Sequence, residues 1–114
     1  MPPPKARPDT IDVDFVPRFR EGVTAIPVQD EAILHEEATG SLHQLDQIAA
    51  MVCSLFDGRT SIEGMVSELA AAFRADPEVV RPDVLALTRD LGTKGLLEGI
   101  QGDEPREEGA DSGQ

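Results

Sequence analysis

The sequence of 114 residues has no tryptophan and no tyrosine, and it contains four phenylalanines and a single cysteine. A folded core therefore depends on Leu, Ile, Val, Ala and Met, and a chain of this length has room for one small domain of modest stability. The lone Cys53 excludes an internal disulfide, and a buried structural thiol is expected there. No apolar run has the length that spans a bilayer, and no segment has the layout of a secretory signal. We expect a cytoplasmic protein.

Positive charge is also scarce. Ten Lys and Arg residues against 22 Asp and Glu residues give a formal net charge of −12, and basic residues are outnumbered in every segment. Because neutralising phosphates requires clustered Lys and Arg, nucleic acids and anionic membranes are poor partners. The sequence has no glycine-rich phosphate loop, and Ser61 lacks the context of a nucleophile motif. An active site is therefore not indicated.

The sequence contains two histidines, His35 and His43, which fall on adjacent predicted strands. Two histidines without a third ligand make a weak metal site. We therefore predict neither a metal nor a cofactor.

The composition divides the chain into three parts. Residues 1–16 begin with Met-Pro-Pro-Pro, which favours an extended and solvated backbone, so we predict a disordered head. Residues 17–97 form the predicted folded domain. Residues 98–114 are polar, rich in glycine and carry a net charge of −5, and they form a predicted disordered tail.

Within the head, residues 11–15 alternate apolar and acidic side chains with a period of two. The segment is either a linker with three chance apolar residues or a strand that pairs with a free sheet edge. In the second case it would hold the binding edge until a partner arrives.

Three segments have the composition of strands, namely residues 23–28, 32–36 and 41–45. The loop between the last two holds Gly40, which can adopt a positive φ and so favours a hairpin. The first strand contains Pro27, which suits an edge or a strand end. The pattern predicts a three-stranded antiparallel meander, and we expect its third strand to offer a free edge to a strand from another chain.

Two helices are predicted after this sheet. Asp46 is a good N-cap for the first, which is expected to end at Asp57-Gly58. Thr60 and Glu63 match a capping box that begins the second.

A third helical segment starts at Asp76-Pro77, where a proline in the first turn costs nothing. Pro82 inside the segment predicts a break between a short turn over residues 77–80 and the main helix from about residue 82. That helix is expected to end near Lys94-Gly95, with the glycine in the left-handed conformation.

The third helix presents two stripes of residues. At about 100° per residue, one apolar stripe is the predicted core face and consists of Val80, Val84, Leu87 and Leu91. A second stripe, of mixed polarity, consists of Arg81, Leu85, Thr88 and Gly92. A glycine inside a helix costs about 1 kcal/mol relative to alanine and often marks the close approach of another backbone. Either Gly92 is merely tolerated and Leu85 is core, or this stripe walls a groove beside the third strand.

Several short motifs of the folded part follow one another in a recognisable order. They are Asp30-Glu31-Ala32-Ile33-Leu34, Thr39-Gly40, Leu42-His43-Gln44-Leu45, Ala49-Ala50, Phe56-Asp57-Gly58-Arg59-Thr60, Asp83-Val84 and Lys94-Gly95-Leu96-Leu97. In this order and spacing, residues 28–97 resemble the PqqD family. These small peptide-binding proteins, also described as RiPP recognition elements, serve the biosynthesis of ribosomally made, modified peptides (RiPPs).

The resemblance implies an α+β, winged-helix-like fold with a three-stranded antiparallel β-sheet followed by three α-helices. It also implies a non-catalytic adaptor that binds the leader of a precursor peptide as an added strand. The adaptor presents this leader to a RiPP maturation enzyme, such as a radical SAM enzyme, a cyclase or a leader peptidase. The leader-binding positions carried onto this chain are Ser41, Leu42, His43, Gln44 and Leu45 on the third strand and Arg81, Leu85, Thr88, Arg89 and Gly92 on the third helix.

The chain departs from the family pattern at three positions. Asp46 stands where the family commonly has Asn, and Cys53 lies near a position often held by a bulky aromatic residue. Pro82 interrupts a helix that is usually continuous, which affects the upper end of the predicted groove and hence Arg81.

Two other classes of protein fit parts of the sequence. Small size, acidity and three helices suit an acyl or peptidyl carrier protein, but Ser61 follows Thr60 and precedes Ile62, so the Asp-Ser-Leu attachment context is missing. A winged-helix DNA-binding protein would share the fold class, and the net charge argues against it.

Overall fold

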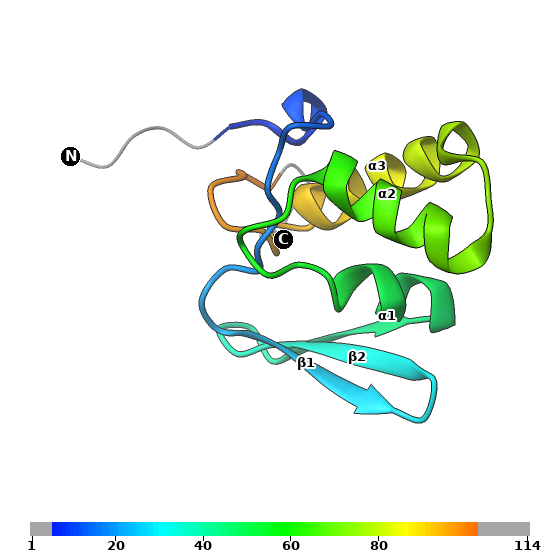
Figure 1. Ribbon diagram of the computed structural model, residues 1–114. Helices are drawn as coiled ribbons and strands as arrows, with labels where there is room; N and C mark the ends of the chain where they lie inside the picture. Colours follow the sequence, from blue (N-terminus) through cyan, green and yellow to red (C-terminus); the bar gives the residue numbers. More distant parts are fainter. Residues whose placement is uncertain (1–5, 103–114) are drawn as a thin grey trace.

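The structure, a computed structural model, describes residues 6–102 (Figure 1). In chain order its elements are a 3-10 turn η1 (Pro8–Thr10), strands β1 (Val23–Val28), β2 (Glu31–Glu36) and β3 (Ser41–Leu45), and helices α1 (Gln47–Cys53), α2 (Ile62–Phe73) and α3 (Pro77–Thr93). The sheet forms one layer, α1 lies over it, and α2 and α3 lie beyond α1 (Figure 1). The predicted fold class, three antiparallel strands followed by three helices, is confirmed.

The three strands form an antiparallel meander in the order β1-β2-β3. The predicted bounds of β1 and β3 are confirmed, and β2 begins one residue earlier than expected. Gly40 turns the β2–β3 hairpin with φ of 73°. The buried residues Ala32 and Leu34 show which face of β2 lies inward. They pair with Leu45 and His43, so these β3 residues lie on the same inner face.

Helix α1 begins as predicted, because the Asp46 side chain accepts a hydrogen bond from the Ala49 amide at 2.8 Å. The expected end at Asp57 was wrong, since the helix stops at Cys53. Asp57 instead accepts the amides of Arg59 and Thr60 at 2.8 Å each, and these bonds lower the pKa of its carboxyl.

Helix α2 begins at a different cap from the one the sequence indicates. The predicted capping box placed the cap at Thr60, but the Ser61 hydroxyl accepts the Gly64 amide at 3.1 Å. The Thr60 hydroxyl donates to Asp57 at 3.0 Å, so the preceding turn has already used it.

Replacing Ser61 by alanine is therefore expected to lower the free energy of unfolding by about 1 kcal/mol, the usual value of an N-cap. The change Thr60→Ala removes an exposed side-chain bond and should cost less than half as much. Urea unfolding of the two variants measures the difference. A larger loss of unfolding free energy from Thr60→Ala than from Ser61→Ala would mean that Thr60 is the N-cap of α2.

Helix α3 is continuous from Pro77 to Thr93, so the predicted break at Pro82 was wrong. Asp76 caps the helix through the Glu78 amide at 2.9 Å. Pro82 is exposed, and so is Glu78, the residue whose carbonyl loses its partner to the proline. The predicted end is confirmed, because Gly95 has φ of 77° and the Leu96 amide reaches back to the Leu91 carbonyl at 3.1 Å.

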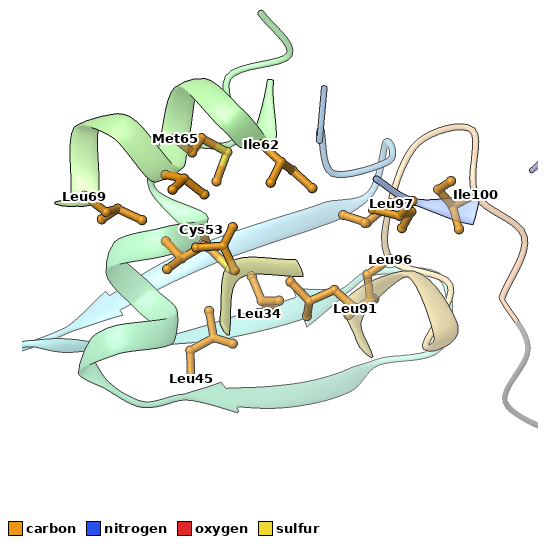
Figure 2. Close-up of a cluster of buried hydrophobic side chains, with 14 of the residues drawn as sticks. Leu34, Leu45, Cys53, Ile62, Met65, Leu69, Leu91, Leu96, Leu97 and Ile100 are labelled. Carbon is orange, nitrogen blue, oxygen red and sulfur yellow. The ribbon is translucent and has the colours of Figure 1, made fainter. Parts of the chain in front are cut away.

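The core lies between the inner face of the sheet and the helices (Figure 2). Leu34 from β2, Ile62 and Met65 from α2, and Leu96 after α3 are all fully buried. Cys53 is buried as expected, and desolvation raises the pKa of its thiol to about 12. Within residues 6–102, every helix is too short or too polar to span a bilayer.

The predicted disorder of the head is not what the structure shows for residues 6–16. Ile11 is 1% exposed and Pro8 is buried, and η1 lies against α3. The carbonyls of Val13 and Phe15 accept the first amides of α2 at 2.9 Å each. The first amides of a helix have no acceptor within the helix, and the head provides two for α2. The apolar side chains of the head become buried against the helices, which composition alone does not predict. Residues 1–5 lie outside the described residues.

The segment after Leu97 also differs from the expectation over its first five residues. Ile100 is 3% exposed, and the backbone of Ala6 pairs with the segment through bonds to Gly99 and Gln101 of 3.0 and 2.8 Å. The two ends of the domain are thus held together, and one apolar side chain is enough to anchor an otherwise polar stretch. The rest of the predicted tail, residues 103–114, lies outside the described residues.

Candidate functional site

The strand β3 is an edge of the sheet, because β2 is its one strand neighbour among the described residues. An edge strand presents unpaired N–H and C=O groups along its open side. The opposite edge is formed by β1, which contains Pro27 and so lacks one donor. The edge that remains suitable for pairing over its whole length is that of β3.

An apolar groove begins where β3 ends. It has a volume of about 400 Å³ and lies between the start of α1, the end of α2 and the first half of α3. The lining residues are Asp46, Ile48, Ala49, Val52, Leu69, Phe73, Ala75, Val80, Asp83, Val84 and Leu87. We call this surface the α1–α3 groove.

Two large apolar side chains on the rim of the α1–α3 groove are exposed to solvent. Ile48 is 62% exposed and Phe73 is 50% exposed. Leu42 of β3, on the outer face of the sheet, is 64% exposed. Exposed apolar residues that surround a groove are typical of a surface that a partner covers.

The predicted strand residues all lie on the free β3 edge, where the sequence placed them. Ser41, His43 and Leu45 are on the inner face and Leu42 and Gln44 on the outer face, as their pairing with β2 shows. Both sets belong to the edge strand, so their backbone lies along the edge at which we expect a partner to pair.

None of the five predicted helix residues is among those that line the α1–α3 groove. Arg81 donates two hydrogen bonds of 3.0 Å to Glu63 of α2. Arg89 donates two, of 3.0 and 2.7 Å, to the Ile11 carbonyl of the head. Both guanidinium groups are therefore engaged with other elements and do not line the α1–α3 groove.

The other three members of that stripe are part of the interior. Thr88 is fully buried and its hydroxyl bonds to the Val84 carbonyl at 2.7 Å. A Cβ on Gly92 would meet Ile100 at 3.0 Å and Ile11 at 3.2 Å. Leu85 is partly buried against the core cluster. The expected wall of Arg81, Leu85, Thr88, Arg89 and Gly92 is therefore corrected, because none of these residues lines the α1–α3 groove. Arg81 pairs with α2, and Arg89 and Gly92 lie against the chain's own head and Ile100.

Three of the four residues that line the groove from α3 are ones the sequence assigned to the core, and the fourth is Asp83. Val84 is buried, but Val80 and Leu87 are only partly buried and Asp83 is exposed. The signal available in the sequence was Asp83 itself, since a carboxylate bordering an apolar stripe indicates that this border meets water.

Behind β3, a buried ion pair connects the sheet to the end of α3. Glu36 is 3% exposed and accepts a hydrogen bond from Arg20, whose Nε also donates to the Gly95 carbonyl at 2.6 Å. The Nε2 atom of His43 lies 3.6 Å from the Glu36 carboxylate. These contacts fix the inner side of β3 at its hairpin end.

The two histidines do not face each other as the hairpin pattern allowed. His35 pairs with Leu42 on the outer face, whereas His43 pairs with Leu34 on the inner face. Over residues 6–102, no three His, Cys, Asp or Glu side chains are grouped so as to hold a metal ion.

The pair formed by Glu63 and Arg81 predicts a pH dependence of stability. The two hydrogen bonds from Arg81 hold the pKa of the Glu63 carboxyl below its usual 4.5. The pair therefore stabilises the fold above that pH and ceases to do so as the pH falls through the folded-state pKa. The stability difference between the wild type and Glu63→Gln should shrink as the pH falls from 6 to 3 in urea titrations. Arg81→Gln should show the same trend, and a difference that stays constant with pH would contradict it.

Solved structures with the same arrangement of sheet and helices define the class of fold. The solution NMR structure of the PqqD truncation of Methylobacterium extorquens PqqCD, described as a stand-alone RiPP recognition element, aligns with a TM-score of 0.69 and 27% identity. The alignment covers 80% of this chain and 97% of that chain. TbiB1 in complex with the TbiA(beta) leader peptide aligns with a TM-score of 0.66 and 28% identity, over 73% of this chain and 96% of that chain. The fold is that of a RiPP recognition element.

Sequence relatives agree with this class. The family model of coenzyme PQQ synthesis protein D (PqqD) matches residues 31–97, and the chain belongs to the PqqD family. A PqqA binding protein of Xanthomonas oryzae is 43% identical over 54 residues, which cover 47% of this chain and 59% of that relative's length. A PqqA binding protein of Xanthomonas campestris is 36% identical over 90 residues, covering 77% of this chain and 96% of the relative.

Proposed function

We propose that this protein is a non-enzymatic adaptor that binds the leader of a ribosomally made precursor peptide and presents it to a modifying enzyme. The observation that carries the proposal is the free β3 edge, which leads directly into the apolar α1–α3 groove. Relatives named as PqqA binding proteins and a similar fold solved with a leader peptide support it.

In this mechanism the leader adds a fourth strand to the sheet. Its backbone satisfies the open N–H and C=O groups between Ser41 and Leu45, which supplies affinity that depends little on sequence. Alternate side chains of an added strand point to the inner side, at intervals of two residues. A peptide that continues past Leu45 places such a side chain in the α1–α3 groove, which provides selectivity.

The affinity expected of such a complex is modest. A short peptide without structure loses conformational entropy when it is ordered, so a Kd between about 10 µM and tens of nanomolar is reasonable.

The buried Cys53, with its raised thiol pKa, is inert, and the groove contributes no nucleophile or histidine among its lining residues. We propose a binding role in the cytoplasm without catalysis.

Amide NMR combined with hydrogen exchange tests the proposal. Candidate leaders are synthetic peptides from short open reading frames encoded next to the gene. A true leader should shift the amides of β3 and of Val80, Asp83 and Leu87, and it should slow exchange at alternate β3 amides because those gain backbone partners. If no candidate perturbs β3, or if only groove side chains respond while β3 exchange is unchanged, strand addition is wrong.

A further inference from the structure

The charge on the α1–α3 groove has one sign. Its charged lining residues are Asp46 and Asp83, and no Lys or Arg is among those that line it. Asp46 already caps α1 through the Ala49 amide, which satisfies part of its carboxylate. Asp83 is exposed at the rim, next to the apolar wall formed by Val80 and Leu87.

The basic residues of α3 do not neutralise this rim. Arg81 is directed to Glu63 and Arg89 to the head, on the other side of the helix. Lys94 is paired with Asp90 at 3.0 Å. Arg74 lies between the lining residues Phe73 and Ala75 in sequence but is not itself among the lining residues. The two lining carboxylates and the net charge of −12 on the chain therefore give the groove a negative potential.

We propose that the groove selects leader segments in which a bulky apolar residue is accompanied by Lys or Arg on the same face of the strand. This inference rests on the proposed function and specifies its ligand. The apolar side chain fills the space between Ile48, Phe73 and Leu87, and the cation pairs with Asp83 at the rim. A volume of about 400 Å³ is sufficient for one large side chain together with part of its neighbour.

Desolvation explains why the cation is required. A strand laid over the groove removes water from the Asp83 carboxylate, and an ionised group covered without a partner costs free energy. A cation two residues from the apolar anchor lies on the same face and removes that cost. A leader with Glu at this position would add repulsion to the same penalty.

Charge also distinguishes this occupant from the chain itself. Residues 98–114 carry a net charge of −5, so the protein's own tail is repelled by the groove, and a second copy of the acidic chain is repelled likewise. An external apolar and basic peptide is the occupant that the potential favours.

Three synthetic peptides of about twelve residues test the inference with the full chain. Each is acetylated at the N-terminus, amidated at the C-terminus, and has a sequence rich in Thr and Val with one central Leu. The peptides differ at the two positions that lie two residues before and two residues after that Leu, where they carry Lys, Gln or Glu. We expect the Lys peptide to bind about fivefold more tightly than the Gln peptide and the Glu peptide to bind more weakly than either. The spread should contract in 0.5 M NaCl.

Two variants of Asp83 and one matched control make the result specific. Asp83→Asn should bring the three affinities together, and Asp83→Lys should reverse their order. Asp14→Lys makes the same change of charge at an exposed position in the head and should preserve the original order. Its neighbours Val13 and Phe15 bond to the first amides of α2, whereas the groove is lined from α2 by Leu69 and Phe73 near the other end of that helix.

The outcomes separate this inference from the proposed function. Equal affinities with shifted β3 amides would overturn the charge selection and leave strand addition intact. An order that Asp14→Lys changes as much as Asp83→Lys would show a general charge effect and would also overturn the inference. The absence of any β3 shift with all three peptides would count against both.

Discussion

Replacing Leu87 by glutamine is expected to weaken leader binding by about 10- to 100-fold, the value of one apolar side chain buried against a ligand. Leu87 lines the α1–α3 groove from α3 and is only partly buried in the free protein. Glutamine has a similar size and helix propensity and adds no charge, so the change tests the apolar wall separately from the potential of Asp83. Isothermal titration calorimetry with the best-binding leader measures the loss.

Leu85 provides the matched control, because it too is partly buried against the core but lies on the side of α3 that faces away from the groove. Leu85→Gln should lower the free energy of unfolding about as much as Leu87→Gln and leave the Kd unchanged. The exposed Ala86→Gln should alter neither quantity. If Leu85→Gln weakened binding and Leu87→Gln did not, the leader would lie on the stripe first predicted from the sequence, and the groove would be the wrong surface.

This reversal of the two stripes shows where sequence reasoning about the site stops. Periodicity correctly found two faces of α3, and the alternation and turn chemistry of residues 23–45 correctly found the sheet and its free edge. Periodicity does not say which face meets the core and which meets a partner, because both contain apolar residues. That decision depends on what else packs nearby.

Gly92 illustrates the point. A glycine inside a helix predicts the close approach of another backbone, but the groups that approach Gly92 are side chains. The approaching groups are Pro8, Ile11 and Ile100, from segments whose composition predicted disorder. A few apolar residues in a polar, proline-rich stretch are enough to anchor it when the folded domain offers a complementary surface. The composition of the stretch does not show whether such a surface exists.

The same limit applies to helix boundaries. Pro82 predicted a break from a local rule, but one lost hydrogen bond at an exposed position is outweighed by the packing of Val80 and Val84 on either side of it. Ser61 rather than Thr60 caps α2 because Asp57 had already engaged the threonine. In both cases tertiary or neighbouring contacts decided between local alternatives that are close in free energy.

Replacing Ile11 by alanine is expected to lower the free energy of unfolding by about 2–5 kcal/mol, as for other fully buried aliphatic residues. Ile11 is 1% exposed and contacts Gly92, while its carbonyl accepts both hydrogen bonds from Arg89. Truncation leaves a cavity against α3 that the glycine cannot fill. Chemical denaturation measures the change, and Val16→Ala, at a residue 38% exposed in the same head, should cost less than 1 kcal/mol.

Leader affinity in the same variants distinguishes the two roles that the sequence allowed for residues 11–15. A segment that held the β3 edge as a placeholder would, when weakened or deleted, make the leader bind more tightly. The structure instead places this segment against α2 and α3, so Ile11→Ala should lose stability while the folded protein keeps its Kd. Deleting residues 1–16 should destabilise the domain further, because the first amides of α2 lose their acceptors. A truncated protein that remained as stable as the full chain and bound the leader more tightly would restore the placeholder interpretation.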